Sequence, residues 1–95
     1  MKADELLRQR VVLDENAFAE LVVWRVPSRV QGSDHPYKYR LAYVVDGRCL
    51  LRFDNEQHKG DHYHLADEEM AYNFESLKKL LDDFWAQVDA LRGMQ

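Results

Sequence analysis

The sequence lacks several features that would place its 95 residues in a specialised class of proteins. It has one cysteine, Cys49, so no disulfide can form within the chain, and such a lone thiol is typical of a reducing cytosol. No apolar run approaches the roughly 20 residues that cross a bilayer, and the first residues show no secretory signal pattern. The chain has no internal repeats and no low-complexity tracts. We therefore expect one cytoplasmic domain, residues 1–95, with no membrane association.

The chain also lacks an excess of positive charge. Its formal net charge is −4, from 13 Lys and Arg against 17 Asp and Glu, which argues against a general nucleic-acid binder. The charge is unevenly divided, however. Residues 1–53 contain nine basic and seven acidic side chains, whereas residues 54–95 contain four and ten. This division predicts two surfaces with different partners.

What the chain does have is 46% hydrophobic residues, enough for a single core, and four segments typical of β-strands. Residues 6–13 and 18–26 are rich in β-branched and apolar side chains, with a polar turn between them. The first part of the second segment is apolar on both faces, which predicts an interior strand covered on both sides. Residues 37–45 alternate, and Asp46-Gly47 favours a two-residue type I′ turn into a returning strand over residues 48–53.

The C-terminal segment has the period of a helix. Ser76 is a suitable N-cap, and apolar side chains follow at helical spacing until Gly93. We therefore predict an α+β fold: a four- to five-stranded antiparallel sheet, built from two consecutive hairpins and packed by one C-terminal α-helix. The optional fifth strand would be short and lie near residues 63–72.

Strand alternation also predicts which side chains share a face of the sheet. Arg48 and Arg52 would lie beside Lys38 and Arg40, where cations could follow a phosphate backbone or simply form a solvated surface. Tyr37, Tyr39 and Tyr43 fall on the opposite face, so we favour a core role for them over stacking on bases. Cys49 would share the face of Leu51 and Phe53 as a buried structural thiol.

Several short motifs together resemble the TumE-type toxins of bacterial and archaeal toxin-antitoxin gene pairs. The resemblance covers most of the chain and rests on residues 23–27, His35 with 37–41, 54–56, 59–62 with His64, and Phe74 with the helix start at 76–77. His58 stands where this family usually has Gly, and Phe53 where it often has Tyr. The resemblance implies a growth-arresting toxin held in check by a separately encoded helix-turn-helix antitoxin. It does not supply a catalytic mechanism.

Residues 54–64 concentrate side chains that bind protons, metals or phosphate. In an extended segment His62 and His64 point to the same side, with Asp61 beside them. Cleavage of a phosphodiester needs a base, an acid and cations around the developing charge. We therefore interpret the chain as a small metal-independent ribonuclease that needs no cofactor. The proton-transfer candidates are His62, His64 and His35, oriented by Asp54 and Asp61; the substrate-binding candidates are Lys59, Arg40, Lys38, Arg52 and Asn55.

Two other interpretations of this segment stay open. Asp54, Asp61, His62 and His64 are ligand types that suit zinc, manganese or iron, which would make the protein a metal-dependent hydrolase. Alternatively, the Asp, Asn, Gly and His residues only form a tight solvated loop. A separate hypothesis for the whole protein is a non-catalytic binding module that inhibits a protein or ribosomal target. RNA, the antitoxin and a second copy of the chain, as a homodimer, are the partners to consider.

Overall fold

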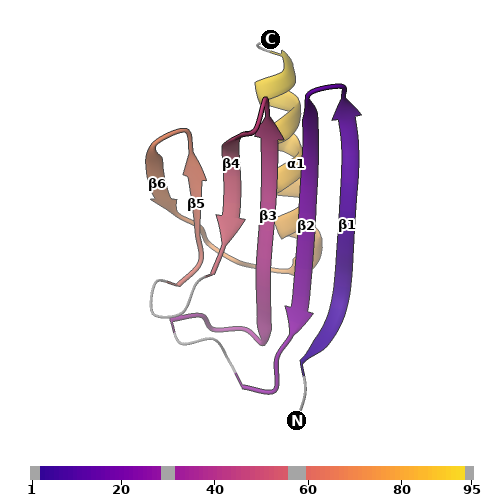
Figure 1. The fold of residues 1–95 in the computed structure, drawn as a ribbon. Helices are drawn as coiled ribbons and strands as arrows, with labels where there is room; N and C mark the ends of the chain where they lie inside the picture. Colours follow the sequence, from indigo (N-terminus) through magenta and orange to yellow (C-terminus); the bar gives the residue numbers. More distant parts are fainter. Residues whose placement is uncertain (1–2, 29–31, 56–59, 94–95) are drawn as a thin grey trace.

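The computed structural model describes residues 3–28, 32–55 and 60–93. It consists of six β-strands followed by one helix (Figure 1). The bounds are β1 Asp4–Asp14, β2 Ala17–Arg25, β3 Tyr37–Val45, β4 Arg48–Asp54, β5 His62–Leu65, β6 Glu68–Ala71 and α1 Leu77–Gly93. The predicted α+β class and both N-terminal hairpins are confirmed. None of the described helices is both long and apolar enough to cross a membrane.

The strands form one antiparallel sheet in which neighbours in sequence are neighbours in space, in the order β1-β2-β3-β4-β5-β6. The prediction of four to five strands was therefore too low. Residues 62–71 form a third hairpin rather than one strand, because the chain reverses between Leu65 and Glu68. Ala66 makes this turn with a positive φ of 54°, a conformation that residues other than glycine rarely adopt. Asp46 and Gly47 both have positive φ, as a type I′ turn requires.

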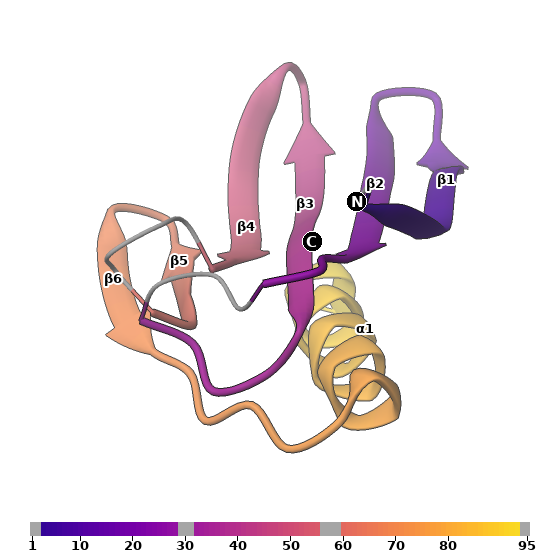
Figure 2. The ribbon, with the colours of Figure 1, turned by 90° about the horizontal axis from the view of Figure 1, so that it is seen from below.

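Helix α1 covers one face of the sheet, as Figure 2 shows. The Ser76 hydroxyl accepts a hydrogen bond from the Lys79 amide at 3.1 Å, so the predicted N-cap is confirmed. The core lies between the helix and the sheet, and its members are fully or almost fully buried: Ala17, Ala19, Leu21, Val23, Tyr39, Leu41, Tyr43, Leu51, Phe53, Leu80, Phe84 and Val88. Tyr39 and Tyr43 are thus core residues, as strand alternation predicts.

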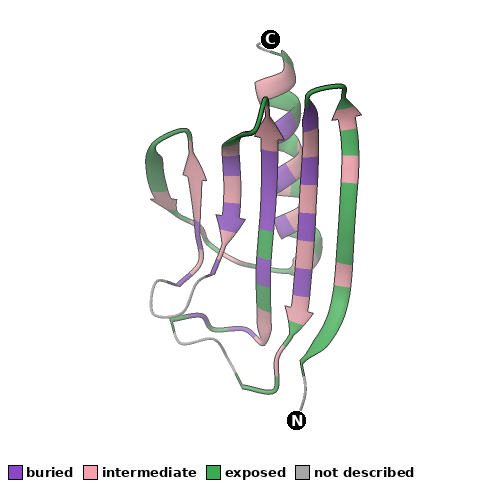
Figure 3. Ribbon diagram, in the orientation of Figure 1, coloured by how far each residue is buried: buried purple, intermediate pink, exposed green. Residues whose placement is uncertain are grey.

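The other face of the sheet, hereafter the open face, has no helix or strand over it in the described part of the chain (Figures 2 and 3). The expectation that both faces of the second strand are covered was wrong, because alternate residues of β2 are only half-buried. Arginine side chains of β1 supply part of the missing cover. The Arg10 guanidinium lies 3.9 Å from the centre of the Phe18 ring, and Arg8 lies 5.8 Å from that of Trp24.

A bulge in β4 changes which side chains reach the open face. Tyr43 is opposite Leu51 but Val44 is opposite Cys49, so Leu50 is an extra residue on β4. The extra residue reverses the alternation for the residues before it. Cys49 is consequently exposed on the open face and is not the buried thiol that we predicted. Arg48 moves to the helix side, so only Arg52 joins Lys38 and Arg40.

Candidate functional site

The predicted site residues divide into two groups at the end of the sheet where β4 ends and β5 begins. We call the first the Asp61 network: Ser33, His35, Tyr39, Asn55 and Asp61. We call the second the imidazole cluster: Arg52, Asp54, His62, His64 and Glu69. Lys59 falls outside the described residues. The two groups differ in burial and in how far their polar atoms are satisfied, so each is described separately.

Asp61 is the centre of the first group. Its Oδ1 accepts a hydrogen bond from the Ser33 hydroxyl at 2.6 Å, and its Oδ2 accepts one from the Tyr39 hydroxyl at 2.7 Å. His35 Nε2 lies 2.7 Å from the same Oδ2. The Tyr37 amide donates to His35 Nδ1, so the ring proton is on Nε2 and is donated to Asp61. Asp61 therefore accepts three hydrogen bonds, two from the connection between β2 and β3 and one from β3.

The network joins the connection between β2 and β3 to the sheet. The Asn55 side chain accepts a hydrogen bond from the Tyr39 amide at 3.0 Å and donates one to the Tyr37 carbonyl at 2.6 Å. The His35 ring stacks on Phe74, with 3.7 Å between ring centres. His35 and Asp61 are 9% and 8% exposed. Both nitrogens of His35 form hydrogen bonds within the protein, which favours a structural role for this residue over the predicted proton transfer.

This network is also not a serine nucleophile with its base. The Ser33 hydroxyl donates to the Asp61 carboxylate, whereas an activated serine donates to an imidazole. Burial, followed by the hydrogen bond to Asp61, raises the pKa of the Tyr39 hydroxyl far above its ordinary value. Tyr39 therefore remains a neutral donor throughout the physiological range, and the geometry of the network is that of a structural link.

Gly60 connects the two groups. It has a φ of +72°, and a Cβ placed on it would lie 2.9 Å from the Gly32 carbonyl oxygen. A glycine is therefore needed both for the backbone conformation and for the close approach of residue 32. The Gly60 carbonyl oxygen is 3.0 Å from His62 Nδ1. Since a carbonyl can only accept, this contact places a proton on Nδ1 of His62.

The imidazole cluster lies on the open face, where strand pairing brings its members together. Asp54 is opposite His62, and His64 is opposite both Arg52 and Glu69. His62 Nε2 is 2.7 Å from Asp54 Oδ1, while Arg52 Nε is 2.8 Å from Asp54 Oδ2. These contacts are close, but three of the four atoms, His62 Nε2, Asp54 Oδ1 and Arg52 Nε, make no hydrogen bond of good geometry among the described residues, and neither does His64 Nε2.

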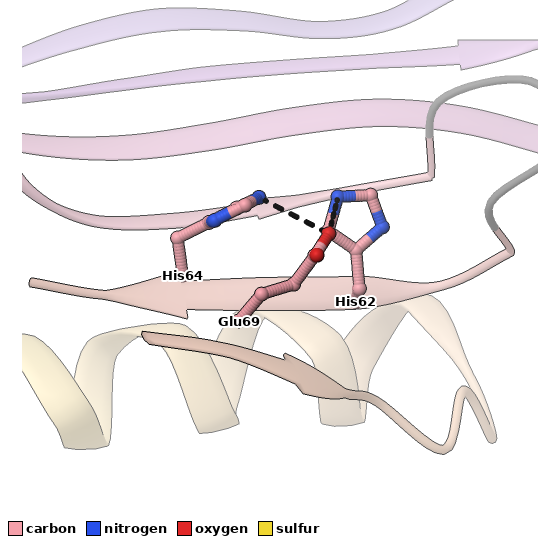
Figure 4. A group of neighbouring side chains, drawn as sticks. All are labelled: His62, His64 and Glu69. Atoms are coloured by element: carbon pink, nitrogen blue, oxygen red, sulfur yellow. Dashed lines mark ion pairs between the residues drawn. The ribbon is translucent and has the colours of Figure 1, made fainter. Parts of the chain in front are cut away.

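Glu69 extends from β6 between the two histidines of β5 (Figure 4). Its Oε1 lies 3.5 Å from His62 Nε2 and 3.6 Å from His64 Nε2. The two imidazole rings meet edge to face, with 5.1 Å between their centres. His62 is 5% exposed, His64 28% and Glu69 48%, so the carboxylate covers the two nitrogens from the solvent side.

The predicted cations adjoin this cluster. Lys38 and Arg40 are exposed on β3, and Arg40 is opposite Asp54. Together with Arg52 they line a surface pocket of about 270 Å³, whose other lining residues are Tyr39, Asp54 and Asn55. Arg8 and Arg10 of β1 lie farther across the same face, where each pairs with a carboxylate, Glu5 and Glu20 respectively. The open face therefore has a pocket lined by cations and by Asp54, and Asp54 also contacts the imidazole of His62.

The sequence missed three members of these two groups. Ser33 and Tyr39 were not expected as partners of Asp61, because nothing in the sequence shows that the 26–36 connection returns to residue 61. Glu69 was counted only among the acidic side chains of residues 54–95. Recognition of a two-residue turn after Leu65 would have placed Glu69 opposite His64. The metal interpretation also changes, since Asp61 lies in the other group and Glu69 takes its place beside the histidines.

Comparison with known protein families shows to which family the chain belongs. The model of the family described as Toxin TumE matches residues 2–92, nearly the whole chain. The chain belongs to the TumE toxin family. The resemblance drawn from its motifs is thereby confirmed, and both groups of site residues lie within the matched region. Neither a curated protein nor a solved structure matched the chain.

Membership of the TumE family identifies the chain as a toxin and implies an antitoxin partner in general. A family description does not by itself state a reaction or a target. The activity therefore has to be argued from the chemistry of the open face and of the network beneath it.

Proposed function

We propose that this TumE toxin arrests growth by cleaving RNA, as a metal-independent ribonuclease that acts on the open face of the sheet. The observation that carries the proposal is the pairing of two imidazoles, His62 and His64, beside a pocket lined by Lys38, Arg40 and Arg52. Cations that hold a phosphate next to two groups able to move protons are the requirements of phosphodiester cleavage.

The reaction that fits this arrangement is internal transfer. One imidazole takes the proton from a ribose 2′-hydroxyl, whose oxygen attacks the adjacent phosphorus. The bond from phosphorus to the 5′-oxygen then breaks, and the other imidazole gives that oxygen a proton. The products are a 2′,3′-cyclic phosphate and a 5′-hydroxyl, and no metal or cofactor is consumed or required.

The contacts of the two rings favour a division of roles. His62 donates from Nδ1 to the Gly60 carbonyl, and its Nε2 lies 2.7 Å from Asp54 Oδ1, so a carboxylate adjoins the nitrogen that would carry the transferred proton. We therefore assign His62 as the general acid. His64 is the more exposed ring and suits the general base. In this proposal the half-exposed Glu69 side chain turns away from the two nitrogens when RNA binds.

The product ends test this proposal directly. Purified protein incubated with RNA in excess chelator should produce fragments with 2′,3′-cyclic phosphate and 5′-hydroxyl ends. An oligonucleotide with a single 2′-deoxyribose at the cleavage site should stay intact, because it lacks the attacking hydroxyl. Persistence of the RNA, together with stoichiometric capture of a protein or ribosome, would instead support the non-catalytic inhibitor.

The substrate-binding surface has a matched control. Arg40 lies on the open face, whereas Arg48 is an equally exposed arginine on the helix side. Replacing Arg40 by Ala should weaken RNA binding about tenfold and reduce the salt dependence of binding by about 0.7 in log–log slope. Replacing Arg48 by Ala should leave both unchanged. Equal losses in the two variants would mean that binding is unspecific attraction to a charged protein.

The partner that restrains this activity is proposed on charge. Among residues 54–95, acidic side chains outnumber basic ones by ten to four. We propose that a helix-turn-helix antitoxin uses a basic segment to bind this acidic half, and that the complex weakens as salt is added. Binding that is indifferent to ionic strength would contradict this arrangement. A homodimer stays a further proposal, tested by the molar mass in solution.

A further inference from the structure

The geometry points to a transition-metal site at the imidazole cluster: we propose that His62 Nε2, His64 Nε2 and a carboxylate oxygen of Glu69 bind a zinc-class ion. The three ligand atoms come from two paired strands and all lie within 4.8 Å of one another. Two ligands of one tetrahedral zinc ion are about 3.3 Å apart, given metal–ligand distances of about 2.0 to 2.1 Å. The distances of 3.5 and 3.6 Å from Glu69 to the two nitrogens are close to that value.

The second observation is that these buried nitrogens make no hydrogen bond of good geometry, although carboxylate oxygens lie near both of them. His62 Nε2 and His64 Nε2 have no hydrogen-bond partner among the described residues, and neither has Asp54 Oδ1 beside them. Buried polar atoms almost always form hydrogen bonds. Several such atoms that converge on one point without a well-oriented hydrogen bond therefore support a shared ligand. A divalent cation would satisfy both nitrogens at once and would offset the charges of Asp54 and Glu69.

The surroundings of His62 also suit a metal ligand. Its Nδ1 donates to the Gly60 carbonyl, which leaves the lone pair of a neutral ring on Nε2, directed into the cluster. Histidines that bind metals almost always donate their other ring proton to a carbonyl or carboxylate in this way. Gly60, whose replacement would clash with the backbone of residue 32, holds that carbonyl in position.

The ligand set decides the class of ion. Imidazole nitrogens with one carboxylate suit zinc and similar transition metals, whereas calcium and magnesium prefer oxygen ligands throughout. Three protein ligands would leave a fourth position for water. The Asp54 carboxylate lies beside His62 and is held from its other oxygen by Arg52, so it would act as a neighbouring charge rather than as a necessary ligand.

An ion bound here would regulate the proposed ribonuclease. This consequence rests on the proposed function, because it assumes that both imidazoles transfer protons. A metal bound to both Nε2 atoms would occupy the lone pair that the general base needs. It would also take the position of the proton that the general acid donates. Zinc should therefore inhibit RNA cleavage, and a chelator should restore it.

Metal binding can be tested without RNA. Titration of the metal-free protein with zinc alone, followed by calorimetry at neutral pH, should give one site per chain. Cobalt(II) should give the intense visible absorption of a four-coordinate ion with nitrogen ligands. Glu69→Gln should weaken zinc binding at least tenfold, and His64→Ala should reduce it further. Glu69 is half-exposed on an outer strand, so the Gln variant is expected to fold, which its thermal unfolding would verify.

The matched control is Glu68→Gln. It makes the same change of charge at the residue before Glu69 in β6, on the opposite face of the sheet. Its zinc affinity should equal that of the wild type. An absence of zinc binding in the wild type, or equal affinities of the two Gln variants, would overturn the site.

A separate assay distinguishes this site from the proposed activity. If zinc binds as described but the protein never cleaves RNA, the metal site stands and the ribonuclease fails. If RNA is cleaved in chelator and zinc binds without slowing cleavage, the regulatory consequence is wrong. Faster cleavage with zinc would contradict both that consequence and the metal-independent mechanism.

Discussion

The Asp61 network and the imidazole cluster both place histidine beside aspartate, yet they differ in how their polar atoms are satisfied. Asp61 accepts three hydrogen bonds from buried donors, and both nitrogens of His35 are engaged. In the imidazole cluster, both Nε2 atoms lack hydrogen-bond partners among the described residues and lie under a half-exposed carboxylate. Satisfied groups stabilise a fold, whereas unsatisfied ones are available to a ligand. The comparison assigns stability to the first group and function to the second.

The largest expected effect separates the two groups by stability. Asp61→Ala would leave the Ser33, His35 and Tyr39 donors without their acceptor, so we expect it to lower the free energy of unfolding by about 3 to 5 kcal/mol. Glu69→Ala removes no hydrogen bond and should change it by less than about 1 kcal/mol. Urea denaturation of both variants measures the difference. Similar losses would show that the two groups are not distinct.

The division between the two groups could be predicted from the sequence only in part. Strand alternation was sufficient to place His62 with His64, Lys38 with Arg40, and Tyr39 and Tyr43 in the core, because side chains on a strand repeat every two residues. Tyr37, which was expected there too, is only half-buried at the start of β3. The bulge at Leu50 was not predicted, and it reversed the faces of Cys49 and Arg48. The contacts of Asp61 were not predicted either, since they depend on how a long connection folds back, and no local pattern encodes that.

Gly60 allows a sharper comparison, because it touches both groups. Gly60→Ala must adopt a left-handed φ and must also displace the Gly32 carbonyl, so we expect a loss of about 2 to 4 kcal/mol. Gly47 has nearly the same φ, +75°, but open space around it, so Gly47→Ala should cost only about 1 to 2 kcal/mol. Thermal unfolding of the pair isolates the cost of the close approach. If the two variants were equally stable, residues 32 and 60 would not be in contact.

A smaller effect is expected in alkaline solution. The pKa of Tyr39 is raised in the folded protein, mainly by burial and then by its bond to Asp61, from an ordinary value of 10.0. Below pH 10 both states keep the proton, and its contribution to stability is complete. Above that pH the unfolded state loses the proton first, so the free energy of unfolding falls by about 1.4 kcal/mol per pH unit from this group.

The control for this effect is Tyr39→Phe. The variant should be about 1 to 2 kcal/mol less stable at neutral pH, because one buried hydrogen bond is lost. Its stability should fall less steeply above pH 10. The variant's free energy of unfolding should still fall somewhat with pH, because Tyr72 contributes too. The pKa of Tyr72 is also raised, by burial and by its hydrogen bond to Asp83. Parallel slopes for wild type and variant would contradict the buried position of the Tyr39 hydroxyl.

The central claim is that the imidazole cluster carries the function. It is tested most directly by the initial rate of RNA cleavage in excess chelator, measured for wild type and His64→Ala at equal concentrations of folded protein. The account predicts a loss of at least about 100-fold in rate, with the midpoint of urea unfolding little changed, because His64 is partly exposed and acts on the substrate. Cleavage by His64→Ala at the wild-type rate would contradict it.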